Sequence, residues 1–308
     1  MGPAGRTGHT GARRRTGRRH GQPVEDGQLV EDGQPVEDGQ PVERSECERM
    51  TELDGNPVDP ASLERLALVG YGHFTSMRVD DGRVRGLALH LRRLVRDCRT
   101  VFTAELDPEL VRERVRRAVR GRAGSFVVRV TVFDPGLDLA RPADNGRPGI
   151  LVTTRGVGSA PPPPLRVRPV RYERDLPLVK HVGLFGALHA RRRAQLAGAD
   201  DALFHDAAGL VSEGPTWNVG FILDGQVVWP DAAVLPGVTM ALLRDSGHDH
   251  VTAPVTVEQA LAAEAAFAAN TAVGARAISG IADTGLATDH PLLRELQRSY
   301  LSIEGDVL

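Results

Sequence analysis

The sequence predicts a mixed α/β fold of two domains, preceded by a segment without regular structure. In the first half, apolar residues recur at helical spacing and are followed by a run rich in β-branched residues. In the second half, short β-rich runs alternate with turn signals and helical patterns. Four prolines, Pro161–Pro164, form a stiff spacer between the halves. We therefore expect a first domain over 50–157, a linker over 158–165 and a second domain over 166–308.

Residues 1–49 are predicted to be disordered. An arginine-rich run is followed by near-copies of the hexapeptide Gly-Gln-Pro-Val-Glu-Asp, which begin at Gly21, Gly27, Gly33 and Gly39. Each copy has few apolar residues and contains a Gly or Pro that interrupts regular structure. Such a segment cannot bury enough apolar surface to offset the entropy lost on ordering. We expect ordinary folded sequence to begin near Met50.

The first domain is predicted to contain two amphipathic helices and at least two strands. The helices cover 89–103 and 108–120, where apolar residues return every three or four positions. A strand over Phe126–Phe133 is closed by Asp134-Pro135-Gly136, and another strand fits Ile150–Thr153.

The second domain is predicted to open with a strand, Leu165–Tyr172, and a helix over 184–197. Two hairpins follow, with turns at Asp206–Gly209 and at Asp224-Gly225. Their predicted strands are Asp201–His205 with Leu210–Glu213, and Trp217–Leu223 with Val227–Trp229. Further helices are expected from Met240, over 257–268 and over 289–302; the last two flank a stretch of small residues, Ala268–Gly280.

Composition narrows the function classes. The chain has 308 residues, with 38 basic and 40 acidic side chains and a net charge of −2. This balance argues against a general nucleic-acid binder or a protein of anionic membranes, because both partners attract a basic surface. Two cysteines form no disulfide framework, and no apolar run reaches the about 20 residues of a membrane span. We expect a soluble cytoplasmic protein without a metal site.

The basic residues are unevenly divided, with 37 arginines and one lysine, Lys180. A lysine amine can lose its proton and form a Schiff base with a carbonyl, whereas guanidinium stays charged and non-nucleophilic. Composition alone leaves two alternatives open. Lys180 remains by chance in an arginine-biased sequence, or it is retained because its amine is needed.

A series of motifs surrounds this lysine. Lys180 is followed by Glu213, which comes after Asp206-x-x-Gly209, then by Asn218 and by Leu235-x-Gly237-Val238-Thr239. Their order and spacing resemble the fold-type IV pyridoxal-phosphate enzymes, or class IV aminotransferases. This family includes branched-chain and D-amino acid aminotransferases and aminodeoxychorismate lyases. The resemblance extends from about Gly72 to Ile281. It implies a D-amino acid aminotransferase-like fold, pyridoxal 5'-phosphate as cofactor, and a homodimer with active sites near the subunit interface.

The resemblance also assigns roles to residues. Lys180 matches the lysine that carries the cofactor as a Schiff base and moves the α-proton. Glu213 matches the carboxylate beside the pyridine nitrogen, and Asn218 matches the asparagine that supports it. A carboxylate there keeps the ring protonated, so that the ring can accept electrons from a carbanion. The alternative for Glu213 is a simple exposed strand residue.

Three places match the family's phosphate-binding residues. His90-x-x-Arg93-Leu94 resembles the His-x-x-Arg-Leu motif, which assigns the phosphate arginine to Arg93. Val238 and Thr239 stand at a predicted helix start, where free backbone N–H groups favour an anion; Thr239 could instead be a simple helix cap. Thr271 aligns with a further phosphate-binding threonine.

Substrate binding is less defined. Arg129 lies in a predicted strand where related enzymes often carry a cation for the substrate carboxylate, and the alternative is an outward arginine in solvent. The chain also departs from the family at several positions. Thr75 stands where the family has a glutamate, Gly183 replaces an asparagine after the lysine, and Trp217 replaces a small residue in the cofactor segment.

Three functions remain in view. The first is an aminotransferase that moves an amino group between an amino acid and a 2-oxo acid, of either L- or D-specificity. The second is a lyase of the aminodeoxychorismate type that releases pyruvate, because Phe74–Val79 and Lys180-His181 look like that branch. The third is a non-enzymatic binder that uses the arginine-rich segment to engage nucleic acid.

Overall fold

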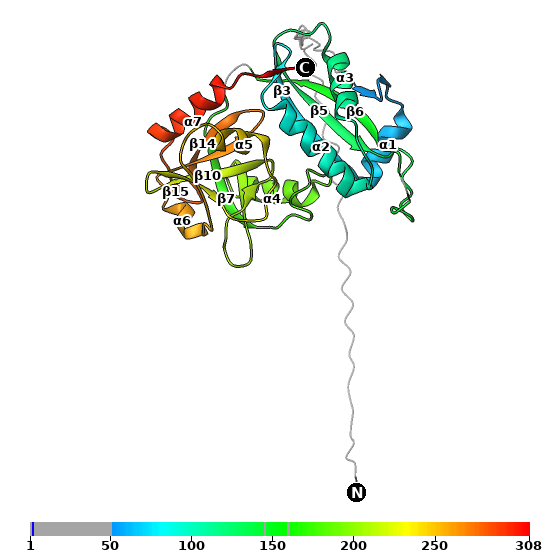
Figure 1. The fold of residues 1–308 in the computed structure, drawn as a ribbon. Helices are drawn as coiled ribbons and strands as arrows, with labels where there is room; N and C mark the ends of the chain where they lie inside the picture. The colour runs from blue at the N-terminus through cyan, green and yellow to red at the C-terminus, as the bar shows by residue number, and fades with distance from the viewer. Residues whose placement is uncertain (1, 3–50, 145, 159–160) are drawn as a thin grey trace, which may run out of the picture. The chain divides into compact units, whose positions relative to one another are not determined.

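The computed structural model describes residues 2, 51–144, 146–158 and 161–308. Apart from residue 2, the segment predicted to be disordered lies outside these residues, as do positions 159–160 of the predicted linker. The described chain has the predicted mixed α/β architecture, with two β-sheets and helices packed against both (Figure 1). None of the helices in the described ranges is both long and apolar enough to cross a membrane.

The first sheet has seven strands in the order β16-β4-β3-β5-β6-β1-β2, and every neighbouring pair is antiparallel. At its centre lie β3 (His73–Asp80), β5 (Ser125–Phe133) and β6 (Gly149–Gly156). Shorter strands flank them, namely β1 (Thr51–Leu53), β2 (Asn56–Pro57), β4 (Arg83–Val84) and β16 (Asp306–Val307), of which β2 and β16 form the edges. The last strand of the chain therefore returns to the sheet built by the first half.

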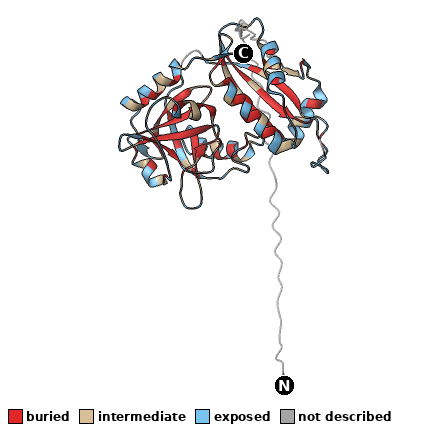
Figure 2. Ribbon diagram, in the orientation of Figure 1, coloured by how far each residue is buried: buried red, intermediate tan, exposed pale blue. Residues whose placement is uncertain are grey.

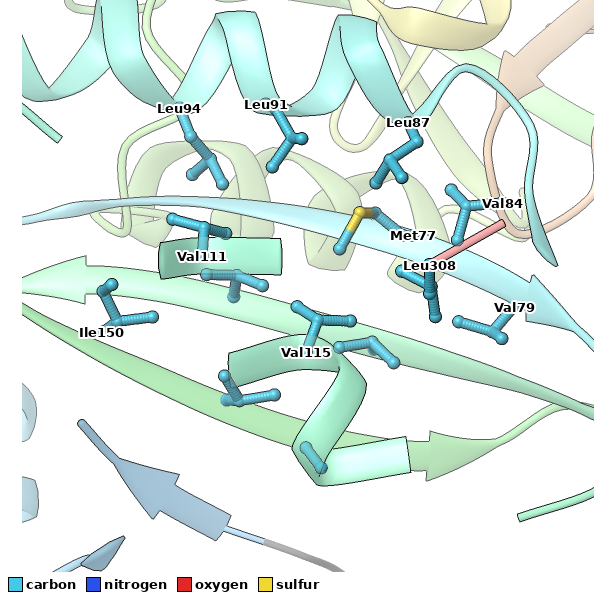
Figure 3. Packing of buried hydrophobic residues seen from close by; sticks show 14 of the residues in the cluster. Met77, Val79, Val84, Leu87, Leu91, Leu94, Val111, Val115, Ile150 and Leu308 are labelled. Carbon is cyan, nitrogen blue, oxygen red and sulfur yellow. The ribbon is translucent and has the colours of Figure 1, made fainter. Parts of the chain in front are cut away.

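Two helices cover one face of this sheet, namely α2 (Leu87–Phe102) and α3 (Pro108–Val119) (Figure 1). Both ranges agree with the sequence prediction, and α3 begins at a proline after the N-cap Asp107. Their apolar stripes pack on the inward residues of the central strands, which include Val128. Figure 3 shows Met77, Val79 and Ile150 in this core. Complete burial of one such side chain contributes about 2 kcal/mol of stability. A third helix, α1 (Pro60–Val69), is shorter and mostly exposed.

The opposite face of the first sheet is polar. Because side chains alternate along a strand, Met77 and Val128 face the helices while Phe74, Ser76 and Arg129 face the other way. The register places Ser76 opposite Arg129, and Arg129 opposite Thr153. These residues line the cavity described below.

The second sheet has nine strands and mixed pairing. Its main order is β12-β11-β10-β13-β14-β7-β8, with β9 (Glu213–Gly214) paired to β10 and β15 (Thr284–Gly285) paired to β14. The remaining strands are β7 (Leu165–Arg171), β8 (Asp201–His205), β10 (Trp217–Leu223), β11 (Gln226–Pro230), β12 (His250–Ala253), β13 (Ala265–Asn270) and β14 (Gly274–Ile281).

Both faces of the second sheet are buried, as the colouring of its strands in Figure 2 shows. One core gathers Val219, Phe221 and their neighbours beside α6 (Val257–Leu261). The other core gathers Ile222 and Phe267 under α5 (Val238–Arg244) and α7 (Pro291–Ser302). The remaining helix, α4 (Phe185–Leu196), packs its alanines against β7 and β8.

Two predicted elements are wrong in part. The helix expected over 257–268 ends at Leu261, and Ala265–Asn270 forms the central strand β13. Alanine favours helices, but this run forms a central strand that is buried on both faces of the sheet. Tertiary packing there overrides the local helical propensity. The strand expected over Leu210–Glu213 is reduced to isolated bridges and the two-residue β9.

His73 gives the first sheet a predictable response to acid. It is fully buried, and neither ring nitrogen has a hydrogen-bond partner within the described part of the chain. Burial lowers the pKa of His73 from 6.5 to about 4, so the folded protein resists a proton that the unfolded chain accepts. The resulting stabilisation is complete above pH 6.5 and is lost as the pH falls toward 4, by about 3 kcal/mol in total.

Urea unfolding at pH 7 and pH 4 measures this effect. We expect His73→Leu to lose clearly less stability between the two pH values than the native chain does. His189→Leu is the matched control, because His189 is exposed on α4. Equal pH dependence of the two variants would contradict the assignment.

Candidate active site

A cavity of about 440 Å³ is lined by every residue that the sequence predicted for the site. Its wall is formed by strands β3, β5 and β6 of the first sheet, by α2, and by the segments around β9, β10, α5 and the β13–β14 turn. The predicted residues in the wall are Arg93, Arg129, Lys180, Glu213, Asn218, Val238, Thr239 and Thr271. Positions up to 178 residues apart in the sequence (93 to 271) thus meet at one place.

Lys180 lies in the irregular segment between β7 and α4, and its side chain is partly buried at the cavity wall. The Nζ atom lies 4.9 Å from the centroid of the Phe74 ring. Loss of hydration lowers the pKa of the Lys180 amine to about 7, and the positive charges of Arg93 and Arg174 act in the same direction. At neutral pH a large part of the amine is therefore uncharged and nucleophilic.

Glu213 is buried in β9 and is held by several donors. Arg174 Nε donates to its Oε1 at 2.6 Å, while Asn218 Nδ2 and the Leu235 N–H each donate to Oε2 at 3.3 Å. Burial raises the pKa of Glu213, and the charge of Arg174 opposes that rise. An ionised carboxylate offers about four acceptor sites and three donors use them here, so Glu213 retains capacity to accept a further donor from the cavity.

Asn218 connects Glu213 to the loop that enters α5. Its Nδ2 also donates to the Leu235 carbonyl at 2.8 Å. Gly237 lies so close that a Cβ there would come within 2.0 Å of Asn218 Oδ1. Glycine at this position therefore lets the loop approach the asparagine, which explains the Leu-x-Gly part of the motif.

Arg93 projects from α2 and is 7% exposed. Its Nη2 donates to Thr75 Oγ1 at 2.6 Å, and that hydroxyl also lies 2.7 Å from His90 Nδ1. Burial lowers the pKa of Arg93 to about 10, and Asp97 opposes this effect. The Nε atom of Arg93 has no hydrogen-bond partner among the residues described. Such a buried cation retains donors for an anion.

The other predicted phosphate residues lie at the ends of elements. Val238 and Thr239 form the first turn of α5 and are both buried. Thr271 lies in the turn between β13 and β14. That turn is held by Asn270 Oδ1, which accepts from the N–H groups of Ala272 at 3.0 Å and Val273 at 3.2 Å.

Arg129 faces the cavity rather than bulk solvent. Its guanidinium carbon lies 3.6 Å from the centroid of the Phe74 ring, and Nε donates to Thr131 Oγ1 at 3.1 Å. Burial, followed by repulsion from Arg155, lowers the pKa of Arg129. It has no ion pair with a carboxylate in the described ranges. An arginine in this state favours an anionic group that enters the cavity.

The structure shows the contacts made at two positions where the chain departs from the family motifs. Thr75 takes the place of the glutamate and accepts the bond from Arg93. Trp217 is 5% exposed and packs in a core of the second sheet, with its Nε1 bound to Asp201 Oδ2 at 2.8 Å. The hydrogen bond and the core packing therefore hold the indole in one orientation at the cavity wall.

Two contributors escaped the sequence analysis. Arg174, the partner of Glu213, and Asp97, which bonds the backbone of Lys180, belong to no recognised motif. Arg174 is one of 37 arginines and precedes Lys180 in a segment without periodicity, so no signal in the sequence selects it.

Comparison with known proteins agrees with this geometry. The model of the family described as amino-transferase class IV matches residues 72–281. A putative branched-chain-amino-acid aminotransferase of Methanocaldococcus jannaschii is 28% identical over 228 residues, which cover 67% of this chain and 76% of the relative.

Solved structures share the fold. The branched-chain aminotransferase of Thermoproteus uzoniensis with norvaline superposes with a TM-score of 0.73 at 21% identity, over 82% of this chain and 93% of that one. The 4-amino-4-deoxychorismate lyase of Pseudomonas aeruginosa gives a TM-score of 0.70 at 24% identity, over 81% and 97% of the two chains. The predicted resemblance is thereby confirmed, and the chain belongs to the class IV aminotransferase family of pyridoxal-phosphate-dependent enzymes.

Proposed function

We propose that this protein is an aminotransferase that exchanges an amino group between an amino acid and a 2-oxo acid, with Lys180 as the residue that bonds the cofactor's aldehyde. The observation that carries the proposal is the meeting of Lys180, Glu213 and Arg93 in one cavity. An amine with a lowered pKa, a buried carboxylate and a buried cation with free donors are the three groups that pyridoxal 5'-phosphate requires.

The residues present fit that cofactor. Arg93, with its unpartnered Nε, would bind the phosphate together with Val238 and Thr239 at the start of α5 and with Thr271. Glu213, supported by Asn218, would accept a hydrogen bond from the protonated pyridine nitrogen. When bound, the cofactor supplies an electron sink that stabilises negative charge at the substrate's Cα.

The protein's own groups would then do three things. Lys180 Nζ has a pKa of about 7, so it can take the proton from the substrate's Cα and later release it to the cofactor's C4′ without a large energetic penalty. Glu213 lies in an ion pair with Arg174, whose charge favours the ionised carboxylate on that side of the cavity. Arg129 would orient the substrate by its carboxylate, over the face of Phe74.

The proposal makes a direct assay possible. The purified protein, supplied with pyridoxal 5'-phosphate, is incubated with a panel of L- and D-amino acids and with pyruvate or 2-oxoglutarate as acceptor. Appearance of a new amino acid from the acceptor supports the aminotransferase. Lack of transfer with every donor, in a protein that binds the cofactor, would contradict it.

A lyase is the second candidate, because a specific feature favours it. His181 follows Lys180 directly, as expected for the aminodeoxychorismate lyase branch, and it lies beside His73 of β3 through a β-bridge. Release of pyruvate from aminodeoxychorismate, without an added acceptor, distinguishes this reaction from transamination. The related fold of the Pseudomonas aeruginosa lyase makes the assay worthwhile.

We also propose that the chain acts as a homodimer and that 50–157 and 166–308 are its two domains, except that β16 and Leu308 complete the sheet and the core of the first domain. Four large apolar side chains near Lys180 are exposed, namely Leu176, Leu178, Phe185 and Leu188. An apolar patch of this kind supports contact with a second copy. Light scattering gives the oligomeric state.

Arg93 should determine affinity for the phosphate group. We expect Arg93→Gln to raise the Kd for pyridoxamine 5'-phosphate about 30-fold, equivalent to about 2 kcal/mol for a lost charge-assisted contact. Arg92→Gln is the matched control, because Arg92 is its exposed neighbour on α2. Isothermal titration with pyridoxamine 5'-phosphate and with pyridoxamine, which lacks the phosphate, provides the measurement. Equal weakening of both ligands would show that Arg93 does not act on the phosphate.

A further inference from the structure

The backbone around Lys180 depends on contacts from other parts of the chain. Residues 172–184 connect β7 to α4 without helix or strand, apart from a single bridge residue, and Leu176 adopts a left-handed φ of 46°. A segment without a hydrogen-bonded ladder does not fix the direction of its own side chains. The direction of the Lys180 amine therefore depends on which groups bind the backbone of this segment.

Asp97 supplies one of those contacts from α2. Its side chain is fully buried, and Oδ2 accepts the backbone N–H of Lys180 at 3.0 Å. On the other side of the same residue, the Lys180 carbonyl accepts the N–H of Phe74 at 2.8 Å. Both peptide groups of Lys180 are thus held, one by a strand backbone and the other by a carboxylate.

Arg96 extends the anchor. Its Nη2 donates to Asp97 Oδ1 at 2.6 Å and to the Leu178 carbonyl at 2.5 Å, and its Nε donates to the same Oδ1 at 3.0 Å. Two side chains of α2 therefore bind the segment at positions 178 and 180. A buried carboxylate is costly to dehydrate, and the arginine satisfies the oxygen that the Lys180 amide does not use.

The position of Asp97 on the helix links this anchor to the phosphate arginine. Asp97 lies one turn after Arg93, and its negative charge favours the charged form of that arginine. The strand β3, where Thr75 replaces the family's glutamate, offers Arg93 only a neutral oxygen. Asp97 thus supplies a countercharge to Arg93 and holds the backbone of Lys180 with the same carboxylate.

We propose that Asp97 is a positioning residue that fixes the Lys180 amine at a set place relative to Arg93, so that one rigid helix aligns the cofactor's aldehyde with the amine when its phosphate is bound. This inference rests on the proposed function, because it concerns the attachment of pyridoxal 5'-phosphate to Lys180. It assigns to α2 the role of setting the separation between the two ends of the cofactor site.

The test separates cofactor binding from cofactor attachment. Pyridoxamine 5'-phosphate has no aldehyde, so its Kd reports the phosphate and ring contacts alone. The rate constant for covalent attachment of pyridoxal 5'-phosphate, followed by absorbance and by borohydride trapping with mass spectrometry, reports the alignment of Lys180. In Asp97→Asn we expect attachment to slow about 10- to 100-fold, as for a misplacement of about 1 Å, with the Kd changed less than about threefold. Asp97→Leu should slow attachment further.

Asp134→Asn is the control for general destabilisation. Asp134 is also a buried aspartate, and its Oδ1 accepts the Gly136 N–H at 2.8 Å, but it does not line the cavity that contains Lys180. We expect this variant to lower the unfolding temperature while attachment and Kd keep their native ratio. If attachment in Asp97→Asn falls only in proportion to the Kd, or does not change, the proposal is overturned. Failure of the native protein to attach the cofactor at all would instead overturn the proposed function.

Discussion

Replacing Lys180 with alanine should remove the visible absorbance band of the cofactor-loaded protein and lower the transamination rate by about four orders of magnitude or more. The reason is the absence of a substitute. The other 37 basic residues are arginines, which remain charged and cannot bond an aldehyde. Arg93, Arg174 and Arg129 lower the pKa of the lysine but cannot replace its amine.

Two further experiments sharpen this prediction. Lys180→Arg is the matched control, since it restores a positive charge without a nucleophile and should be as inactive as the alanine variant. Borohydride reduction of the loaded native protein should label one internal side chain, and peptide mapping should locate it at Lys180. An absorbance band or a stable label that survives in either variant would contradict the assignment.

Replacing Glu213 with glutamine should lower kcat about 100-fold or more while the protein still binds pyridoxamine 5'-phosphate. Glutamine has nearly the same shape, so the bonds from Asn218 and Leu235 can persist. The change removes the negative charge that would keep the pyridine nitrogen protonated, and it leaves Arg174 without its ion-pair partner. Stopped-flow measurement of a single half-reaction with an amino acid isolates this step.

Arg174→Gln is the informative companion variant. Burial raises the pKa of Glu213 and Arg174 counteracts this rise, so loss of the arginine should raise the pKa further. If ionised Glu213 is required, the acidic limb of the pH–rate profile must move to higher pH in this variant. A profile that stays in place would show that the charge of Glu213 does not control the rate.

Local patterns predicted the first sheet's helices well and some strands poorly. The helices α2 and α3 have continuous apolar stripes, which a single core face requires. The strand β13 failed because its alanines carry a helical preference, and its true environment is set by β10 and β14, which are distant in sequence. The short strands β1, β2 and β16 have too few residues to show any period.

The site was predicted by motif order rather than by local structure. Lys180 and Glu213 were identified because their spacing resembles a family, and the cavity contains both. Asp97 and Arg174 act through bonds to residues 83 and 39 positions away in the chain. Such pairings are decided by the path of the chain in space, and no spacing rule within one sequence records them.

The pairing of β16 with β4 has a consequence for how this chain is made. Leu87 and Asp306 are joined by a hydrogen bond across 219 positions, and Leu308 is buried in the core of the first sheet. While the ribosome synthesises the second half, the emerging first sheet has an unpaired edge along β4 and a gap in its core. Until residues 306–308 have been synthesised, the first sheet therefore lacks one of its strands and part of its core.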